Sequence, residues 1–141
     1  MDTCIEKLYV DDIADLQEAL FEEVTRYKYE IDYENFVKGF MSCKYRRLLD
    51  DFNTRVANMT WDELLMYIEN DCKELLIKGN TNVDRLQSGW IGRMYSLLQY
   101  RLNISSEELY NKVPLSRIKT LFVPLHTVDE EIALKKIENS I

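Results

Sequence analysis

The segment WIGRMYSLLQYRL, residues 90–102, predicts a helix that is apolar around much of its girth. Two adjacent faces of this helix carry Trp90, Met94, Leu97 and Arg101 on one side, and Ile91, Tyr95, Leu98 and Leu102 on the other. Such a helix packs in the middle of a protein, so we expect it to be the central element of the fold. Gly89 and Gly92 at its start either let another backbone approach closely or only fray the helix end.

Downstream of this helix the sequence predicts three more. Ser105 and Glu108 form a capping box for a helix over 105–112, and Pro114 ends that helix. A helix over 115–122 follows and is closed by Pro124. Thr127 and Glu130 form a further capping box for a helix over 127–137.

Upstream, apolar residues at steps of three and four predict helices over 11–29, 32–56 and 61–78. Aspartates start the first helix, Asp32 caps the second, and a Thr60–Glu63 capping box starts the third. Gly79 and Asn80 are typical of a left-handed helix end. The best strand candidate, Leu8-Tyr9-Val10, is too short to favour a sheet.

These patterns predict an all-α fold, a compact bundle of six or seven helices with a tri-helical C-terminal part. With 141 residues the chain is long enough for one domain with a real core, and we assign residues 1–141 to a single helical domain. The polar segment 79–82 is the alternative boundary, dividing an acidic lobe, 1–80, from a basic tri-helical lobe with a C-terminal helix, 81–141.

Charge is unevenly distributed along the chain. Ten basic and nineteen acidic residues precede residue 85, whereas six basic and two acidic residues lie within 85–123. One face of the first helix carries Asp15, Glu18, Glu22 and Glu23 with almost no basic residues, so its carboxylates repel one another mildly. This face is either an ordinary solvated surface or a docking surface for a basic partner.

Helices over 90–102, 105–112 and 115–122 resemble a helix-turn-helix arrangement in the basic part of the chain, which raises DNA binding through 85–123 as a hypothesis. The recognition helix would offer only Arg117 and Lys119 to phosphates or base edges. The sequence pI of 4.8 opposes tight nonspecific DNA binding.

Catalytic and metal-binding signatures are absent from the sequence, so we expect no enzyme activity, cofactor or metal. His126 is the only histidine, and a local capping or packing role is the simplest interpretation of it. Cys4, Cys43 and Cys72 are too far apart for a zinc knuckle and suit reduced, half-buried thiols. The acidic start, Met1 to Glu6, and the lack of a long apolar run predict a cytoplasmic protein without membrane contact.

Several short motifs resemble those of small bacterial helical proteins. The matching stretches are Trp90-Ile91-Gly92-Arg93-Met94-Tyr95, Ile104-Ser105-Ser106-Glu107-Glu108-Leu109-Tyr110, Pro124-Leu125-His126-Thr127-Val128-Asp129 and Ile132-Ala133. Residues 40–51, FMSCKYRRLLDD, are similar to a stretch of short proteins that accompany them, with Cys43 in place of a usual serine. Such proteins lie beside toxin-like genes on mobile elements, some resembling ADP-ribosyltransferases, so the resemblance implies an antitoxin or immunity role.

The sequence therefore favours a non-enzymatic protein-binding module that inhibits a cognate protein, a toxin or a nucleic-acid-handling protein, by direct contact. Nine tyrosines, five phenylalanines and two tryptophans suit either such an interface or a core whose tyrosines straddle the surface. A DNA-binding regulator is the second hypothesis, and a phage-encoded acidic inhibitor of a host nucleic-acid-binding protein is the third. Whether the chain forms a homodimer is left open.

Overall fold

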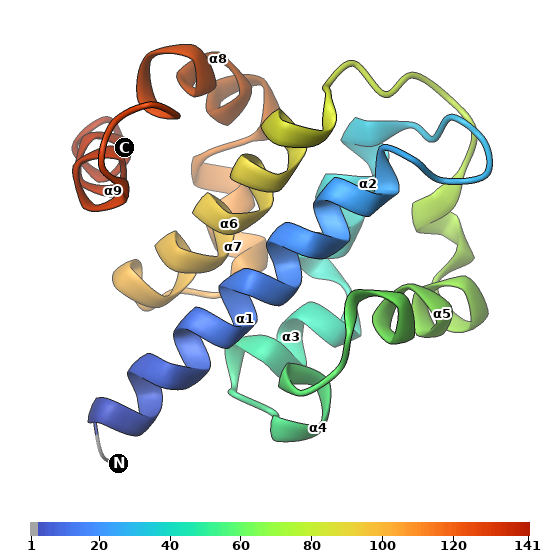
Figure 1. Ribbon diagram of the computed structural model, residues 1–141, viewed down its shortest axis with the longest axis horizontal. Coiled ribbons are helices and arrows are strands. Elements are labelled where there is room, and N and C mark those ends of the chain that lie inside the picture. The colour runs from blue at the N-terminus through green and yellow to red at the C-terminus, as the bar shows by residue number, and fades with distance from the viewer. Residues whose placement is uncertain (1–2) are drawn as a thin grey trace.

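Nine α-helices and one 3-10 turn form the part of the chain that the computed structural model describes, residues 3–141, with side chains from residue 7 onward (Figure 1). The helices are α1 (Thr3–Val24), α2 (Tyr33–Ser42), α3 (Lys44–Asp50), α4 (Thr54–Ala57), α5 (Trp61–Asp71), α6 (Arg85–Leu102), α7 (Ser106–Lys112), α8 (Leu115–Leu125) and α9 (Glu130–Asn139), and the 3-10 turn η1 is Lys73–Leu76. Residues 3–141 contain no strand, only an isolated bridge between Ile31 and Lys78. The predicted all-α class is confirmed.

The central position predicted for the helix over 90–102 is confirmed by its packing. α6 buries nine of its residues, and α1 packs along much of its length (Figure 1). At Gly92 the two backbones are so close that a Cβ atom would lie 2.9 Å from the carbonyl oxygen of Gln17 and 2.6 Å from Cγ of Phe21. The Gln17 side chain also donates from Nε2 to the Gly92 carbonyl oxygen at 2.7 Å. Gly92 therefore serves close helix approach, the first of the two interpretations of this glycine.

The single helix predicted over 32–56 is wrong, because the structure divides this segment into α2, α3 and α4. Cys43 is extended, with φ −77° and ψ 164°, and Phe52 is left-handed, with φ 57°. The first break reorients the chain so that α3 buries Tyr45, Arg46 and Leu49. This division explains why nine helices replace the expected six or seven.

The predicted bounds of the first helix are also wrong. α1 begins at Thr3, so Asp11 and Asp12 lie within it instead of starting it, and Leu8-Tyr9-Val10 is helical. It ends at Val24 instead of near residue 29. Just after this end, the Thr25 hydroxyl donates to the Glu22 carbonyl oxygen at 2.7 Å. A side chain that bonds the last turn in this way competes with helix propagation. Of the acidic start, Met1 to Glu6, residues Met1 and Asp2 lie outside the described residues.

The left-handed helix end predicted at Gly79-Asn80 is wrong as well. α5 ends at Asp71, and none of the glycines has a positive φ. Gly79 instead lies against residue 32, where a Cβ atom would be 2.8 Å from Cα of Asp32. Backbone hydrogen bonds from Gly79 to Glu30 and from Tyr33 to Asn80 tie the 79–82 segment to the start of α2 and the loop before it. One hydrophobic cluster draws its residues from both sides of this segment.

Helix caps agree with the sequence at three positions and differ at two. Asp32 and Ser105 accept the expected backbone hydrogen bonds, and the Thr60–Glu63 capping box is complete. α9 is capped by Asp129 instead of Thr127. Pro124 lies inside the last turn of α8, which continues to Leu125, so it does not close that helix as predicted.

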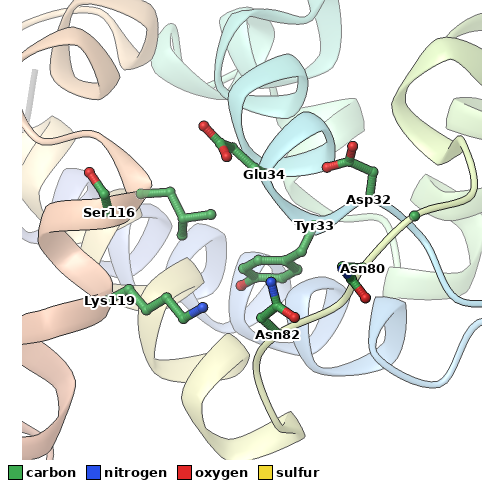
Figure 2. A pocket seen from close by; sticks show the side chains of 9 residues that line it. Asp32, Tyr33, Glu34, Asn80, Asn82, Ser116 and Lys119 are labelled. Carbon is green, nitrogen blue, oxygen red and sulfur yellow. The ribbon is translucent and has the colours of Figure 1, made fainter.

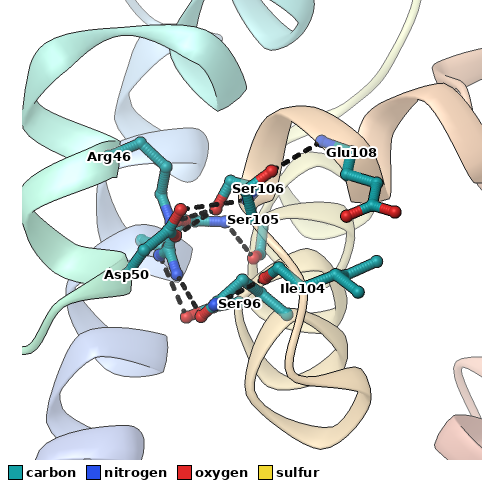
Figure 3. A network of polar contacts seen from close by, with 10 residues as sticks. Arg46, Asp50, Ser96, Ile104, Ser105, Ser106 and Glu108 are labelled. Carbon is teal, nitrogen blue, oxygen red and sulfur yellow. Dashed lines mark hydrogen bonds and ion pairs between the residues drawn. The ribbon is translucent and has the colours of Figure 1, made fainter.

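A buried arginine connects four helices beneath the surface (Figure 3). The Arg46 side chain is 1% exposed and donates to Asp50 on its own helix and to Ser106 on α7. It also donates to Gln17 on α1, at 2.6 Å, and to two residues of α6, Ser96 and Gln99. Burial lowers the pKa of Arg46, and the nearby Asp50 carboxylate counteracts that effect.

Candidate functional site

The acidic face of α1 is paired within the chain by arginines of α6. Arg93 lies 2.7 Å from Asp15 and 3.3 Å from Glu18, and it also reaches Glu130 on α9. Arg85 lies 3.7 Å from Glu22 and 3.8 Å from Glu23. The acidic first part of the chain and the basic part after residue 84 thus pair with each other in the fold.

Negative charge remains in excess on this surface after pairing. The carboxylates of Asp15, Glu18, Glu22, Glu23 and Glu130 face the guanidinium groups of Arg26, Arg85 and Arg93. The pKa of Glu18 is raised above its ordinary value, chiefly by burial and further by the neighbouring carboxylates of Glu22 and Asp15. Arg93 lowers this pKa, but by less than burial raises it. The face is therefore acidic, and Glu18 bears an electrostatic penalty there.

Replacing Glu18 by glutamine is expected to raise the thermal unfolding midpoint slightly at pH 7. A carboxyl group whose pKa is raised by folding destabilises the folded state while it is ionised, and this penalty disappears once pH falls below the unfolded pKa, about 4.3. The gain from Glu18→Gln should thus shrink between pH 7 and pH 4. Thermal unfolding of variant and parent at both pH values checks this, with Asp11→Asn as the control on an exposed part of α1. A gain that grows toward pH 4 would contradict it.

Beside the acidic face lies a surface that the sequence did not predict, and we call it the α6–α8 patch. It consists of Leu86, Trp90, Phe122, Val123 and His126. Leu86 is 67% exposed and Val123 is 74% exposed. The Trp90 ring meets the Phe122 ring edge-on with centroids 5.5 Å apart, and the Phe122 ring stacks on the His126 ring at 4.1 Å. By helical spacing Leu86 neighbours Trp90 and Val123 neighbours His126, so the patch joins two exposed aliphatic side chains to an ordered aromatic cluster.

Each helix presents its part of the patch at helical spacing. Leu86 and Trp90 are four residues apart on α6, and Phe122 and Val123 lie in the last turn of α8, with His126 as the C-cap of that helix. The two helices are held together here by a hydrogen bond from Gln87 Nε2 to the Lys119 carbonyl oxygen at 3.4 Å. The sequence pattern did not identify Leu86 as a site residue, because Leu86 lies in the first turn of α6, before the predicted helix at 90–102. An apolar residue just after the Asp84 cap was the available signal.

The acidic face adjoins the α6–α8 patch directly. Gly89 lies three residues from Leu86, and therefore on the neighbouring part of the same side of α6. A Cβ atom at Gly89 would lie 2.6 Å from Cγ of Glu22 and 3.4 Å from Cγ of Glu18. The missing side chain at residue 89 therefore lets the acidic face of α1 border the apolar surface.

The two residues predicted to contact DNA lie on α8, both partly buried. Lys119 lines a hollow of about 640 Å³ together with Asp32 and Glu34 (Figure 2). Figure 2 shows the Lys119 side chain directed toward Tyr33 and Asn82 across this hollow. A phosphate that approached Lys119 would also meet two carboxylates, which repel it. The helices α6, α7 and α8 are present as predicted, but the surroundings of Lys119 do not favour DNA.

His126, Cys43 and Cys72 do not form a metal-binding group in the described part of the chain. His126 is the C-cap of α8, and its Nδ1 bonds the Phe122 carbonyl oxygen of the last turn at 2.7 Å. Cys43 is half-buried and Cys72 is buried, both are free thiols, and burial raises the pKa of each. The Cys4 side chain lies outside the described residues. Within the described residues, no three His, Cys, Asp or Glu side chains gather in a geometry that could hold a metal ion.

Several tyrosines that the sequence left between core and surface are buried with bonded hydroxyl groups. Tyr33 bonds Ser88 at 2.7 Å, and Tyr95 donates to the Val113 carbonyl oxygen at 2.7 Å. Tyr45, 3% exposed, donates to Asp71. These rings belong to the core and leave the α6–α8 patch as a separate aromatic surface.

Comparisons with known proteins found no match, so a proposal about function has to rest on the surfaces described above. No family model, no curated protein and no solved structure matches this chain. The resemblance to proteins encoded beside toxin-like genes therefore stays a prediction. Among the helices described, none has the length and apolar character needed to cross a membrane.

Proposed function

We propose that this chain is a protein-binding module of the antitoxin or immunity type, which inhibits a cognate protein by covering part of its surface. The observation that carries the proposal is the α6–α8 patch, where Leu86 and Val123 stand exposed beside the Trp90–Phe122–His126 cluster. Neither catalytic chemistry nor a cofactor is part of this mechanism. Inhibition follows from occupying a surface that the target needs.

The composition of the patch supports binding to a protein. Aromatic side chains with exposed aliphatic neighbours are the usual anchors of protein interfaces, because they bury large apolar areas and lose little conformational entropy. Trp90 and Phe122 are already held by ring contacts, so few side chains need to be ordered on binding. The acidic border of Glu18 and Glu22 supplies the polar rim of such an interface.

Replacing Leu86 by glutamine is expected to weaken binding of the cognate protein about tenfold or more, because burial of a leucine contributes roughly 1.5–3 kcal/mol. Leu8→Gln is the matched control, because Leu8 is 66% exposed on α1, as exposed as Leu86. The measurement is recovery of a tagged chain from its native host after nuclease treatment, with the retained protein quantified by mass spectrometry. One stoichiometric protein should be kept by parent and Leu8→Gln and lost with Leu86→Gln.

Two results would count against the proposal. Equal retention by both variants would show that the partner does not use the α6–α8 patch. Retention of DNA alone in an untreated sample would favour the DNA-binding regulator, and salt-dependent retardation of upstream DNA that Arg117→Ala and Lys119→Ala abolish would establish it. For the antitoxin role itself, co-expression with the recovered partner should restore growth with Leu8→Gln but not with Leu86→Gln.

A further inference from the structure

α9 shows how this fold covers the outward face of α6. Leu86, Trp90, Arg93 and Leu97 form one stripe along α6, at intervals of four, three and four residues. α9 packs against α6 as an amphipathic helix whose buried side chains are Ala133, Leu134 and Ile137. Leu97, at the C-terminal end of the stripe, is only 7% exposed.

Charge pairing accompanies this helix packing. Glu130 of α9 bonds Arg93, and Glu131 and Glu138 bond Arg101. An acidic amphipathic helix thus covers the part of α6 that presents arginines. Figure 1 shows α9 away from the N-terminus of α6, and Leu86 is the second residue of α6.

At the N-terminal end of the same stripe, near Leu86, the neighbouring charges on α1 are carboxylates. There Glu18 and Glu22 of α1 lie over Gly89, between Leu86 and Arg93, and Glu23 is close by through its contact with Arg85. Arg85, itself 52% exposed, lies 3.7 Å from Glu22 and 3.8 Å from Glu23. Arg26 pairs with Glu23 at 2.6 Å and Arg93 with Glu18 at 3.3 Å, so three carboxylates share these arginines, and Arg93 also pairs with Asp15 and Glu130. A second helix laid along Leu86 and Trp90 would therefore meet an apolar surface with an acidic flank.

We infer that the α6–α8 patch binds an amphipathic helix of the partner protein that places apolar side chains on Leu86 and Trp90 and lysines or arginines against Glu18, Glu22 and Glu23. This helix would continue the layer that α9 begins on the stripe, with the charge pattern reversed. The inference rests on the proposed function and adds the chemistry of the partner. It identifies a basic helical segment, as found in proteins that handle nucleic acids or other polyanions.

Substitution of Arg85 tests whether the partner helix is basic or acidic. This arginine competes with any basic partner for Glu22 and Glu23, so Arg85→Ala should tighten binding about threefold at low salt. The double variant Glu22→Gln, Glu23→Gln should weaken it by about the same factor. An acidic partner would produce the reverse order, so the direction of the two effects decides the charge of the partner.

The experiment uses Trp90 as the reporter. The chain holds two tryptophans, so Trp61→Phe leaves Trp90 as the single tryptophan, inside the α6–α8 patch. The probes are two helical peptides with the same leucine stripe, one with lysines on its polar flank and a twin with glutamates in their place. We expect the lysine peptide to change Trp90 emission and the glutamate twin to leave it unchanged. Anisotropy of labelled peptides on the unaltered chain repeats the comparison without the Trp61 substitution.

Each outcome bears on a defined claim. Saturable binding of the lysine peptide that Leu86→Gln removes, Leu8→Gln keeps and Arg85→Ala strengthens supports the inference. Equal effects of Leu86→Gln and Leu8→Gln would mark the binding as general attraction to an acidic protein and overturn it. If the recovered cognate protein is lost with Leu86→Gln but binds more weakly to Arg85→Ala, the inference fails while the proposed function stands. A dimer of the chain that dissociates with Leu86→Gln would assign the patch to a second copy and overturn both.

Discussion

Replacing Arg46 by alanine is expected to lower the free energy of unfolding by about 3–5 kcal/mol, the typical cost of removing one partner of a buried ion pair. The guanidinium group donates to five side chains on four helices, and Asp50 is the only one of them that carries a charge. Its loss would leave the Asp50 carboxylate, 11% exposed, with donors from Ser106 alone, and would leave Gln17 without a partner for its Oε1. Buried acceptors without donors carry most of the cost.

Urea denaturation of the variant and the parent measures this loss. Arg47→Ala is the matched control, because Arg47 is the next residue on α3 and its side chain is exposed. We expect it to change stability by no more than about 0.5 kcal/mol. Replacing the pair together, as Arg46→Met with Asp50→Asn, should cost less than the sum of the single changes because no uncompensated charge remains. Equal losses for Arg46→Ala and Arg47→Ala would show that the network adds no stability.

Gly92→Ala is expected to destabilise the protein by about 1–3 kcal/mol, although alanine is the better helix former. The added Cβ atom would meet the backbone carbonyl oxygen of Gln17 at 2.9 Å and the Phe21 side chain at 2.6 Å. Neither can yield easily, because one is helix backbone and the other is a ring packed against Phe36 and Phe40. α1 and α6 would have to separate, which opens the largest helix contact of the fold.

Gly89→Ala is the control for this prediction, one turn earlier on the same helix. The atoms nearest to its Cβ would belong to the side chains of Glu22 and Glu18, which are flexible and partly exposed. The expected change is small, since the gain in helix propensity, about 1 kcal/mol, offsets the displaced side chains. Urea denaturation of both variants gives the comparison. A larger loss for Gly89→Ala than for Gly92→Ala would contradict the assignment of Gly92 as the point of closest approach.

The amino-acid sequence determined the features that depend on neighbours within one or two turns. Apolar residues at steps of three and four identified most of the helical regions, though not residues 3–10 of α1 or 85–89 of α6, and Asp32, Thr60 and Ser105 cap their helices as expected. The girth of apolar residues around 90–102 also identified the central helix. These are local properties, since a cap bonds the amide three residues on and a buried face repeats every 3.6 residues.

Only the tertiary structure decided the rest. The apolar rhythm of 32–56 continues through Cys43 and Phe52 without a signal, yet the chain turns at both, and the first turn carries Arg46 into a site whose acceptors come from three other helices. The acidic face of α1 looked unpaired because Arg85 and Arg93 are about 70 residues away in the sequence. The α6–α8 patch exists because α8 packs beside the first turns of α6 while α9 covers only the later ones. Such features depend on which surfaces meet, and contact between distant segments has no period that a single sequence displays.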